Sequence, residues 1–114
     1  MRIVNHWSVE CKGIIYRVVH TETGRSYIGA TTKSLKERRI DHIQRAFRGE
    51  QGKLQKAIIT YGPEAFIWTQ IDTANSIDEL AQKEKQYILK YNSKVKGFNS
   101  DNGGGLKKTV YQFR

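Results

Sequence analysis

Three polar side chains in the first half of the chain share one stripe of a predicted helix. Arg38, His42 and Arg45 follow one another at spacings of four and three residues, which brings them to one helix face. A guanidinium holds phosphate oxygens as a planar fork, and an imidazole moves a proton near neutral pH. The stripe alone leaves two interpretations open: a solvated basic surface, or the polar wall of a phosphate-binding site.

A carboxylate interrupts the apolar stripe of the last predicted helix. Glu84 comes four residues after Leu80 and four before Ile88, so it faces the core or a cleft at the edge of the core. An unpaired charge in such a place is costly. Glu84 therefore either pairs with a buried cation or lies in a cleft where it binds a metal ion, and the helix favours neither.

Two tyrosines lie in the arms of a predicted β-hairpin, residues 13–31. Tyr16 follows Gly13 in the first apolar run, and Tyr27 precedes Gly29 in the second. Tyrosine is also a favoured strand residue for packing reasons. The hairpin by itself does not separate a catalytic phenol from a core side chain.

These residue types favour one class of reaction. Two phenols, a guanidinium, an imidazole and a carboxylate in a cleft suit hydrolysis of a phosphodiester. A single carboxylate in oxygen-rich surroundings suits a hard ion such as Mg²⁺ or Mn²⁺. The sequence has no catalytic serine or cysteine arrangement, no P-loop and no zinc-ligand spacing, and His6 and His20 have no partner at metal spacing.

The charge of the chain indicates a polyanionic partner. The 114 residues include 20 Lys and Arg against 11 Asp and Glu, a formal net charge of +9 at pH 7. Such an excess is typical of proteins that bind nucleic acid, and a basic protein with a solvated surface is the alternative. Double-stranded DNA is the expected partner, without a small-molecule cofactor.

Length and cysteine use set further limits. A chain of this length forms one domain. No apolar stretch approaches the roughly 20 residues of a membrane span, and no signal-peptide pattern opens the chain. Cys11 is the only cysteine, which excludes an internal disulfide and a thiolate zinc site and indicates a reducing, cytoplasmic setting.

The elements that must position the candidate residues occur in the order ββ-α-α-β-α. The apolar runs predict strands over residues 13–20, 25–30 and 66–71. Helical spacing predicts helices over residues 34–49, 52–61 and 76–91. This order predicts a small α+β domain with a mainly antiparallel sheet.

The first predicted helix begins with a capping box, Ser34 to Glu37. Ile40, Ile43 and Phe47 form its predicted inward stripe, which turns the stripe of Arg38, His42 and Arg45 away from the core.

The register of the hairpin decides whether its tyrosines can act together. A simple turn with a glycine bulge at Gly24 would pair Tyr27 with Val19 and direct the two phenols to opposite faces. A shared site requires a different register or an extra bulge, and we expect that irregularity.

The sequence resembles the GIY-YIG nuclease superfamily. The segments GIIY and SYIG look like the two parts of the signature of that family, although the first reads G-I-I-Y in place of G-I-Y. Arg38 and His42 on the first helix, Glu84 on the last, and Asn99 in the segment GFNS match in the same order. The glycine-rich segment GFNSDNGGG most resembles phage and intron homing endonucleases.

The resemblance implies a three-stranded sheet flanked by helices, spanning residues 13–105. Residues 1–12 are then an N-terminal extension, and residues 106–114 are a C-terminal tail. The implied function is metal-dependent cleavage of DNA by a homing-endonuclease-like enzyme, such as a phage protein acting in the cytoplasm of a bacterial host. A structure-selective repair nuclease and a non-catalytic nucleic-acid-binding domain are the alternatives.

The resemblance also implies a role for each matched residue. Tyr16 would be the general base for the attacking water, and His42 would assist proton transfer through Tyr16. Tyr27 would organise the site and the phosphate, and Arg38 would stabilise charge on the phosphoryl group. The remaining matched residues are Glu84 as the Mg²⁺ ligand, Asn99 as a support of the site, and Gly13 and Gly29 as motif glycines, with Gly29 keeping the backbone clear beside Tyr27. The predicted DNA contacts are Arg25, Lys33, Lys36 and Arg45.

Overall fold

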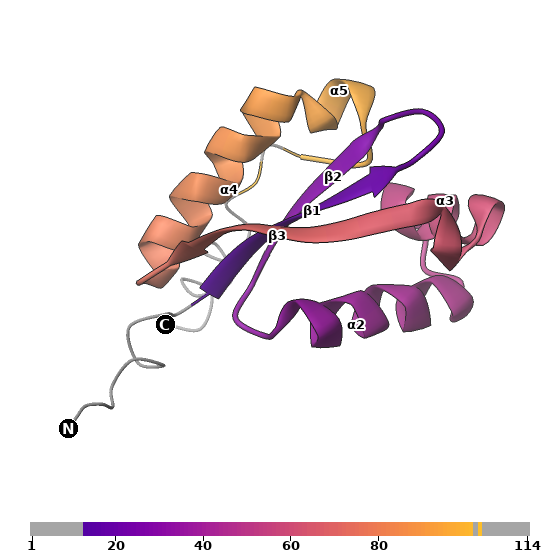
Figure 1. Ribbon diagram of the computed structural model, residues 1–114, viewed down its shortest axis with the longest axis horizontal. Coiled ribbons are helices and arrows are strands. Elements are labelled where there is room, and N and C mark those ends of the chain that lie inside the picture. The colour runs from indigo at the N-terminus through magenta and orange to yellow at the C-terminus, as the bar shows by residue number, and fades with distance from the viewer. Residues whose placement is uncertain (1–12, 102, 104–114) are drawn as a thin grey trace.

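The computed structural model describes residues 13–101 and residue 103, so the predicted extension and tail lie outside the described residues. Its centre is a three-stranded antiparallel sheet in the order β2-β1-β3, built from β1 (Gly13–His20), β2 (Ser26–Thr31) and β3 (Phe66–Ala74). Helices cover both faces of the sheet (Figure 1). The predicted α+β architecture is confirmed.

Two pairs of helices form the outer layers. α2 (Leu35–Phe47) and α3 (Lys53–Tyr61) lie on one face, whereas α4 (Ile77–Tyr91) and the short α5 (Ser93–Lys96) lie on the other (Figure 1). The sequence did not predict α5 or the 3₁₀ turn η2 (Pro63–Ala65) that precedes β3. Among the helices that the structure describes, none combines the length and apolar character needed to cross a membrane.

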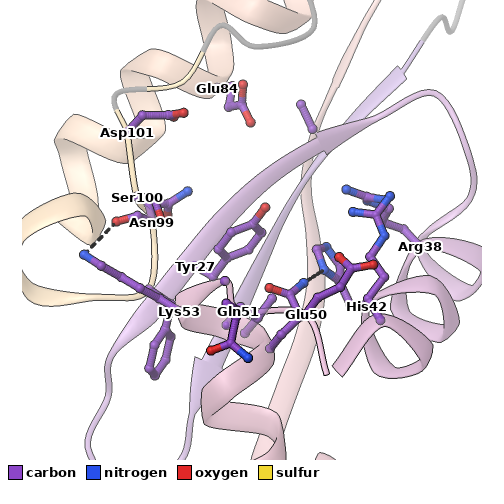
Figure 2. A pocket seen from close by; sticks show the side chains of 16 residues that line it. Tyr27, Arg38, His42, Glu50, Gln51, Lys53, Glu84, Asn99, Ser100 and Asp101 are labelled. Carbon is purple, nitrogen blue, oxygen red and sulfur yellow. Dashed lines mark hydrogen bonds between the residues drawn. The ribbon is translucent and has the colours of Figure 1, made fainter. Parts of the chain in front are cut away.

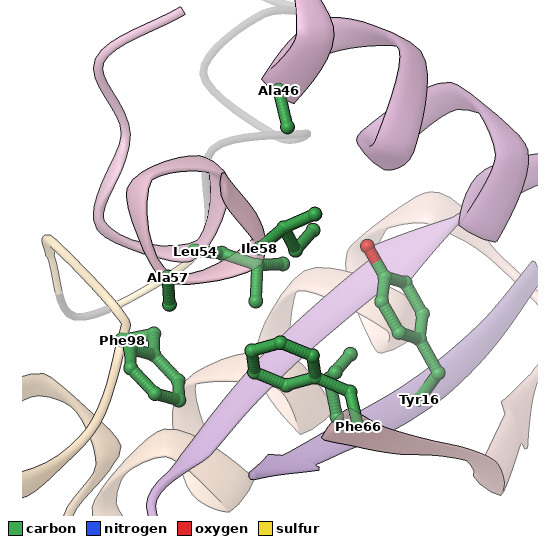
Figure 3. Packing of buried hydrophobic residues seen from close by; sticks show 8 residues of the cluster. Tyr16, Ala46, Leu54, Ala57, Ile58, Phe66 and Phe98 are labelled. Atoms are coloured by element: carbon green, nitrogen blue, oxygen red, sulfur yellow. The ribbon is translucent and has the colours of Figure 1, made fainter. Parts of the chain in front are cut away.

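Each face of the sheet has its own core. On the α3 side, Tyr16, Leu54, Ile58, Phe66 and Phe98 pack together (Figure 3). On the α4 side, the core consists of Ile15, Ile28, Ala74, Leu80 and Ile88. Because adjacent strand residues point to opposite faces, Ile15 and Tyr16 belong to different cores.

The hairpin register brings the two tyrosines to the same face. Val18, rather than Val19, is paired with Tyr27, and Tyr16 is paired with Gly29. Tyr16 and Val18 share a face, so Tyr27 lies on that face too. The expected change of register is confirmed, and a separate irregularity occurs between β1 and β3, at Ile15/Tyr16.

The predicted inward face of α2 is wrong. Ile40 is 45% exposed and Phe47 is 66% exposed, whereas His42 and Ala46 are buried. His42 turns inward because its ring finds hydrogen-bond partners in β1 and α3, which helical periodicity does not reveal. Arg38 also bonds to Tyr16 of β1, whereas Arg45 pairs with Asp41 of the same helix. The capping box at Ser34 and Glu37 is present as predicted.

Candidate active site

A pocket of about 530 Å³ opens between α2, the start of α3, β2 and α4, and residues 98–101 close one side of it (Figure 2). The predicted site residues that line this pocket are Tyr27, Arg38, His42, Arg45, Glu84 and Asn99. Glu84 lies on one side of Tyr27, and Arg38 and His42 lie on the other (Figure 2). The fold therefore brings together residues that are up to 72 positions apart, from Tyr27 to Asn99 (99 − 27 = 72).

Tyr16 does not line the pocket, but it is bonded to two residues that do. Its hydroxyl lies 2.7 Å from Nε2 of His42 and accepts a hydrogen bond of 3.2 Å from Nε of Arg38. The side chain is completely buried. Burial raises the pKa of the Tyr16 phenol, Tyr27 adds to this increase, and Arg38 opposes it. Arg38 is thus the group that most favours the phenolate.

A buried glutamine orients His42. Nε2 of Gln55, in α3, lies 3.0 Å from Nδ1 of His42. When this amide donates to Nδ1, the proton of the neutral imidazole is on Nε2 and is donated to the Tyr16 oxygen. Burial, followed by the charges of Arg38 and Arg45, lowers the pKa of His42 to about 3. His42 is therefore neutral at pH 7.

Tyr27 is the phenol at the pocket itself. Its ring centroid lies 6.1 Å from that of Tyr16 and 5.4 Å from that of His42. Burial raises the pKa of Tyr27, the charge of Arg38 opposes this, and the charges of Glu84 and Asp101 add to the increase. Tyr27 thus lies between the cationic and the anionic sides of the pocket.

Gly29 makes room for the aromatic ring of Tyr16. A Cβ atom at position 29 would overlap Cζ and the hydroxyl oxygen of Tyr16, its partner on the neighbouring strand. Tyr16 therefore requires a glycine at this position, in addition to the role beside Tyr27 that the resemblance implies.

Asp41 holds the two arginines of α2. Its carboxylate accepts a hydrogen bond of 2.5 Å from Arg38 and forms an ion pair of 3.5 Å with Arg45. Desolvation raises the pKa of Asp41, but the charges of Arg45 and Arg38 outweigh this effect and lower it. The carboxylate is ionised at neutral pH, so it competes with any phosphate for these two cations.

Charges of both signs line the pocket in equal number. The cations are Arg38, Arg45 and Lys53, and the anions are Glu50, Glu84 and Asp101. Glu84 and Asp101 lie on the side of α4 and the closing segment, opposite Arg38 (Figure 2). This separation suits a phosphate on one side and a cation on the other.

Asn99 fastens the closing segment to the outer edge of the sheet. Its Oδ1 accepts a hydrogen bond of 2.8 Å from the amide of Ile28, and its Nδ2 donates one of 2.9 Å to the carbonyl of Ile28. The side chain thus behaves like one residue of a neighbouring strand. It also positions the two pocket residues that follow it, Ser100 and Asp101.

Residues 12–99 match the family model described as the GIY-YIG catalytic domain. The chain belongs to this family. The GIY-YIG fold recurs in a solved variant of the catalytic domain of intron endonuclease I-TevI, at a TM-score of 0.72 and 23% identity, over 81% of this chain and 96% of that one. A second structure of the catalytic domain of homing endonuclease I-TevI has a TM-score of 0.68 at 24% identity, over 77% of this chain and 97% of that one. None of the curated proteins matches the sequence.

The other predicted residues lie away from the GIY-YIG pocket. Arg25 lines a second pocket at the hairpin turn, and Lys36 lines a separate hollow beside Trp68. Lys33 is exposed ahead of α2. Gly13 lies in the other layer, where a Cβ atom would collide with Leu80. The predicted DNA contacts therefore do not form one cluster.

Sequence reasoning missed three residues that shape the site. Gln55 lies beside the apolar stripe of α3. A polar side chain next to an apolar stripe could have marked it, in the same way that Glu84 was identified on the last helix. Trp68 stacks on Tyr16 with 6.3 Å between ring centroids, but in the sequence it is an ordinary strand residue. Asp101 lies in a polar segment without periodicity, so no pattern marks it.

Proposed function

We propose that this protein is a metal-dependent DNA endonuclease that hydrolyses phosphodiester bonds in the manner of a homing endonuclease. The hydrogen-bonded group of Tyr16, His42 and Arg38 carries this proposal, because it borders a pocket that Glu84 enters from the opposite side (Figure 2). Membership of the GIY-YIG family and the likeness to the I-TevI catalytic domain support the same reaction class.

A divalent cation fits the side of the pocket that Glu84 and Asp101 form. Mg²⁺ is usually bound by one or two carboxylates together with waters and substrate phosphates, so it does not need a complete protein cage. Within residues 13–101 and residue 103, no three His, Cys, Asp or Glu side chains are grouped as a ready ligand set. Glu84 is therefore the proposed ligand of one Mg²⁺ or Mn²⁺. When bound, this ion would supply positive charge next to the phosphoryl oxygens.

The α2 side of the pocket would bind the scissile phosphate. Arg38 donates from Nε to Tyr16 and from Nη1 to Asp41, which fixes the plane of its guanidinium at the pocket. A phosphate that displaces Asp41 would gain a charge-assisted hydrogen bond from Arg38 and the charge of Arg45. Positive charge held in this place stabilises the oxygens that become more negative in the transition state.

Tyr16 is the proposed base for the attacking water, and it acts as the phenolate, the form that Arg38 favours: the water gives its proton to the phenolate oxygen and attacks as hydroxide. Its oxygen lies against Arg38, so a water can reach it only when the guanidinium turns toward the phosphate. Tyr27 is the second candidate, because its phenol already lines the pocket. Tyr16→Phe should lower the cleavage rate by about 10²–10⁴-fold and leave metal-free DNA binding intact. A larger loss in Tyr27→Phe than in Tyr16→Phe would instead assign the proton transfer to Tyr27.

The deciding experiment is cleavage of supercoiled plasmid with and without Mg²⁺, read as nicked and linear products. Glu84→Gln should abolish cleavage, retain DNA binding in metal-free buffer, and change the melting temperature little, because Glu84 borders an open pocket. The matched control is Glu64→Gln, which removes an exposed carboxylate from η2 and should cut at the wild-type rate. A Glu84→Gln protein that cuts normally would refute the metal role.

Two alternatives give different results in the same assays. A structure-selective nuclease would cut forked or flapped duplexes in preference to linear duplex. A non-catalytic domain would bind DNA and leave the plasmid intact in both Mg²⁺ and Mn²⁺.

A further inference from the structure

A second pocket, of about 350 Å³, lies at the turn of the β1–β2 hairpin, beside the end of α4 and α5. Its cations are Arg17, Arg25 and Lys96, and no carboxylate lines it. The candidate active site differs in this respect, because its cations are matched by an equal number of carboxylates. None of these three cations forms an ion pair within the part of the chain that the structure describes.

The guanidinium of Arg17 is held in place from two sides. Nε donates a hydrogen bond of 2.9 Å to Oγ of Ser26, and the guanidinium carbon lies 4.2 Å from the centre of the Tyr91 ring. Its two terminal nitrogens have no acceptor among the described residues. A half-buried guanidinium that is fixed through Nε and its flat face presents these nitrogens to a ligand with little loss of side-chain entropy.

Arg25 is fixed in a similar way. Nε donates a hydrogen bond of 3.2 Å to the carbonyl of Lys96, and the guanidinium lies 5.0 Å from the centre of the Phe98 ring. Again, the hydrogen bond uses Nε and leaves the two terminal nitrogens without an acceptor in the described chain. The hydrogen bond joins Arg25 to the backbone of Lys96, and the side chains of both residues border the same pocket. A bound anion would be attracted by both cations.

The second pocket lies next to the candidate active site along strand β2. Ser26 lines the second pocket, and the following residue, Tyr27, lines the first. Phe98 also links the two pockets, because it lines the first pocket and its ring packs under the guanidinium of Arg25, which lines the second. The segment that ends in Asn99 covers the outer edge of β2, where Phe98 donates to the carbonyl of Ser26. A polyanion that runs over this segment would therefore pass both pockets, because Gly97 lines the second pocket and Phe98 and Asn99 line the first.

We propose that this second pocket, formed by Arg17, Arg25 and Lys96, binds a backbone phosphate of the DNA next to the site of cleavage. The inference rests on the proposed function for the identity of the polyanion. Two attachment points along one strand would fix the direction of the DNA across the candidate active site, which one phosphate site alone does not do.

The test is the salt dependence of DNA binding in metal-free buffer, measured by fluorescence anisotropy with a short labelled duplex. Each phosphate that a protein neutralises on duplex DNA contributes about 0.9 to the slope of log affinity against log salt. The variant Arg25→Gln/Lys96→Gln alters two exposed side chains, so it should fold, and a melting curve verifies this. We expect its slope to be shallower by about 1 than that of the wild type.

The matched control is Arg39→Gln/Lys56→Gln, which removes the same two charge types from exposed positions on α2 and α3, outside both pockets. Its slope should stay close to the wild-type slope. Equal slopes in the two double variants would overturn the proposal, because the loss would then reflect net charge alone. A third variant, Arg17→Lys, keeps the charge but loses the planar fork, and wild-type affinity in this variant would also overturn the proposal.

Plasmid cleavage by the wild-type protein separates this proposal from the proposed function. Cleavage together with an unchanged slope in Arg25→Gln/Lys96→Gln would overturn the phosphate site and leave the nuclease assignment standing. A shallower slope in this variant, with no cleavage by the wild type in Mg²⁺ or Mn²⁺, would support the phosphate site and overturn the nuclease assignment.

Discussion

Gly29→Ala should lower the free energy of unfolding more than an ordinary surface substitution does, although it adds only one methyl group. The new Cβ would overlap Cζ and the hydroxyl of Tyr16, which is itself fixed by His42 and Arg38. The ring is completely buried and lies against Trp68, so it has little room to move away. Relief of the overlap therefore requires a shift of Tyr16 or a distortion of the β1–β2 pairing.

The expected destabilisation is the sum of three contributions. Overpacking of a filled core costs about 1–3 kcal/mol. Displacement of the phenol breaks its hydrogen bond to His42 and leaves buried polar atoms without partners, at about 1–3 kcal/mol. Replacing a strand glycine with alanine returns roughly 0.5–1 kcal/mol of backbone entropy. The net loss is about 1–5.5 kcal/mol, and the middle of this range, about 3 kcal/mol, lowers the melting temperature of a domain of this size by about 10 °C.

A double-mutant cycle with Tyr16→Leu tests the cause of this loss. Leucine lacks Cζ and the hydroxyl, so Gly29→Ala should cost less than about 1 kcal/mol in that background, and urea denaturation measures the difference. Gly24→Ala is the control: Gly24 has φ +74° and no neighbour that a Cβ would touch. Its cost of about 1–2 kcal/mol should be the same in both backgrounds. A Gly29→Ala cost that is below 0.5 kcal/mol, or independent of residue 16, would refute the close-packing argument.

Two further perturbations test the electrostatics of the site. The folded-state pKa of His42 is about 3 against 6.5 for the free side chain, so the unfolded chain binds the extra proton and stability falls as the pH decreases from about 6.5 toward 3. Between pH 7 and pH 5 the lowered pKa of His42 should reduce the free energy of unfolding by about 2 kcal/mol. His42→Gln lacks this proton-binding group, so the stability difference between the wild type and this variant should shrink by the same amount. A difference that does not change with pH would contradict a neutral imidazole in the folded protein. Asp41→Asn should release Arg38 and Arg45, tighten metal-free DNA binding and steepen its salt dependence, at a stability cost below about 1 kcal/mol. Weaker DNA binding in this variant would show that Asp41 holds the two arginines in the orientation that binds DNA, rather than competing with phosphate for them.

The elements of the fold could be predicted because their signals are local. Ser34 and Glu37 mark the start of α2, and Gly62 and Pro63 end α3, through short-range hydrogen bonding and backbone restriction. Glu84 could be singled out because it breaks an apolar stripe.

The inward face of α2 could not be predicted in the same way. Amphipathic patterning assigns the apolar stripe to the core, but His42 is buried by partners on two other elements, Tyr16 in β1 and Gln55 in α3. Those contacts exist only after the sheet and α3 have packed. The hairpin register likewise depends on the loop of residues 21–25, where Gly24 donates to the carbonyl of His20 and His20 donates to the carbonyl of Arg25.

The double hydrogen bond between Asn99 and Ile28 has a consequence for folding and for self-association. It closes a loop of 71 residues onto an edge strand, so this contact carries a large entropic cost and is favoured only once the two layers are in place. The exchange rate of the Ile28 amide proton therefore reports directly on docking of the closing segment, independently of global unfolding. Because the side chain occupies backbone groups that would otherwise pair with a further strand, it also blocks edge-to-edge growth of the sheet at this position.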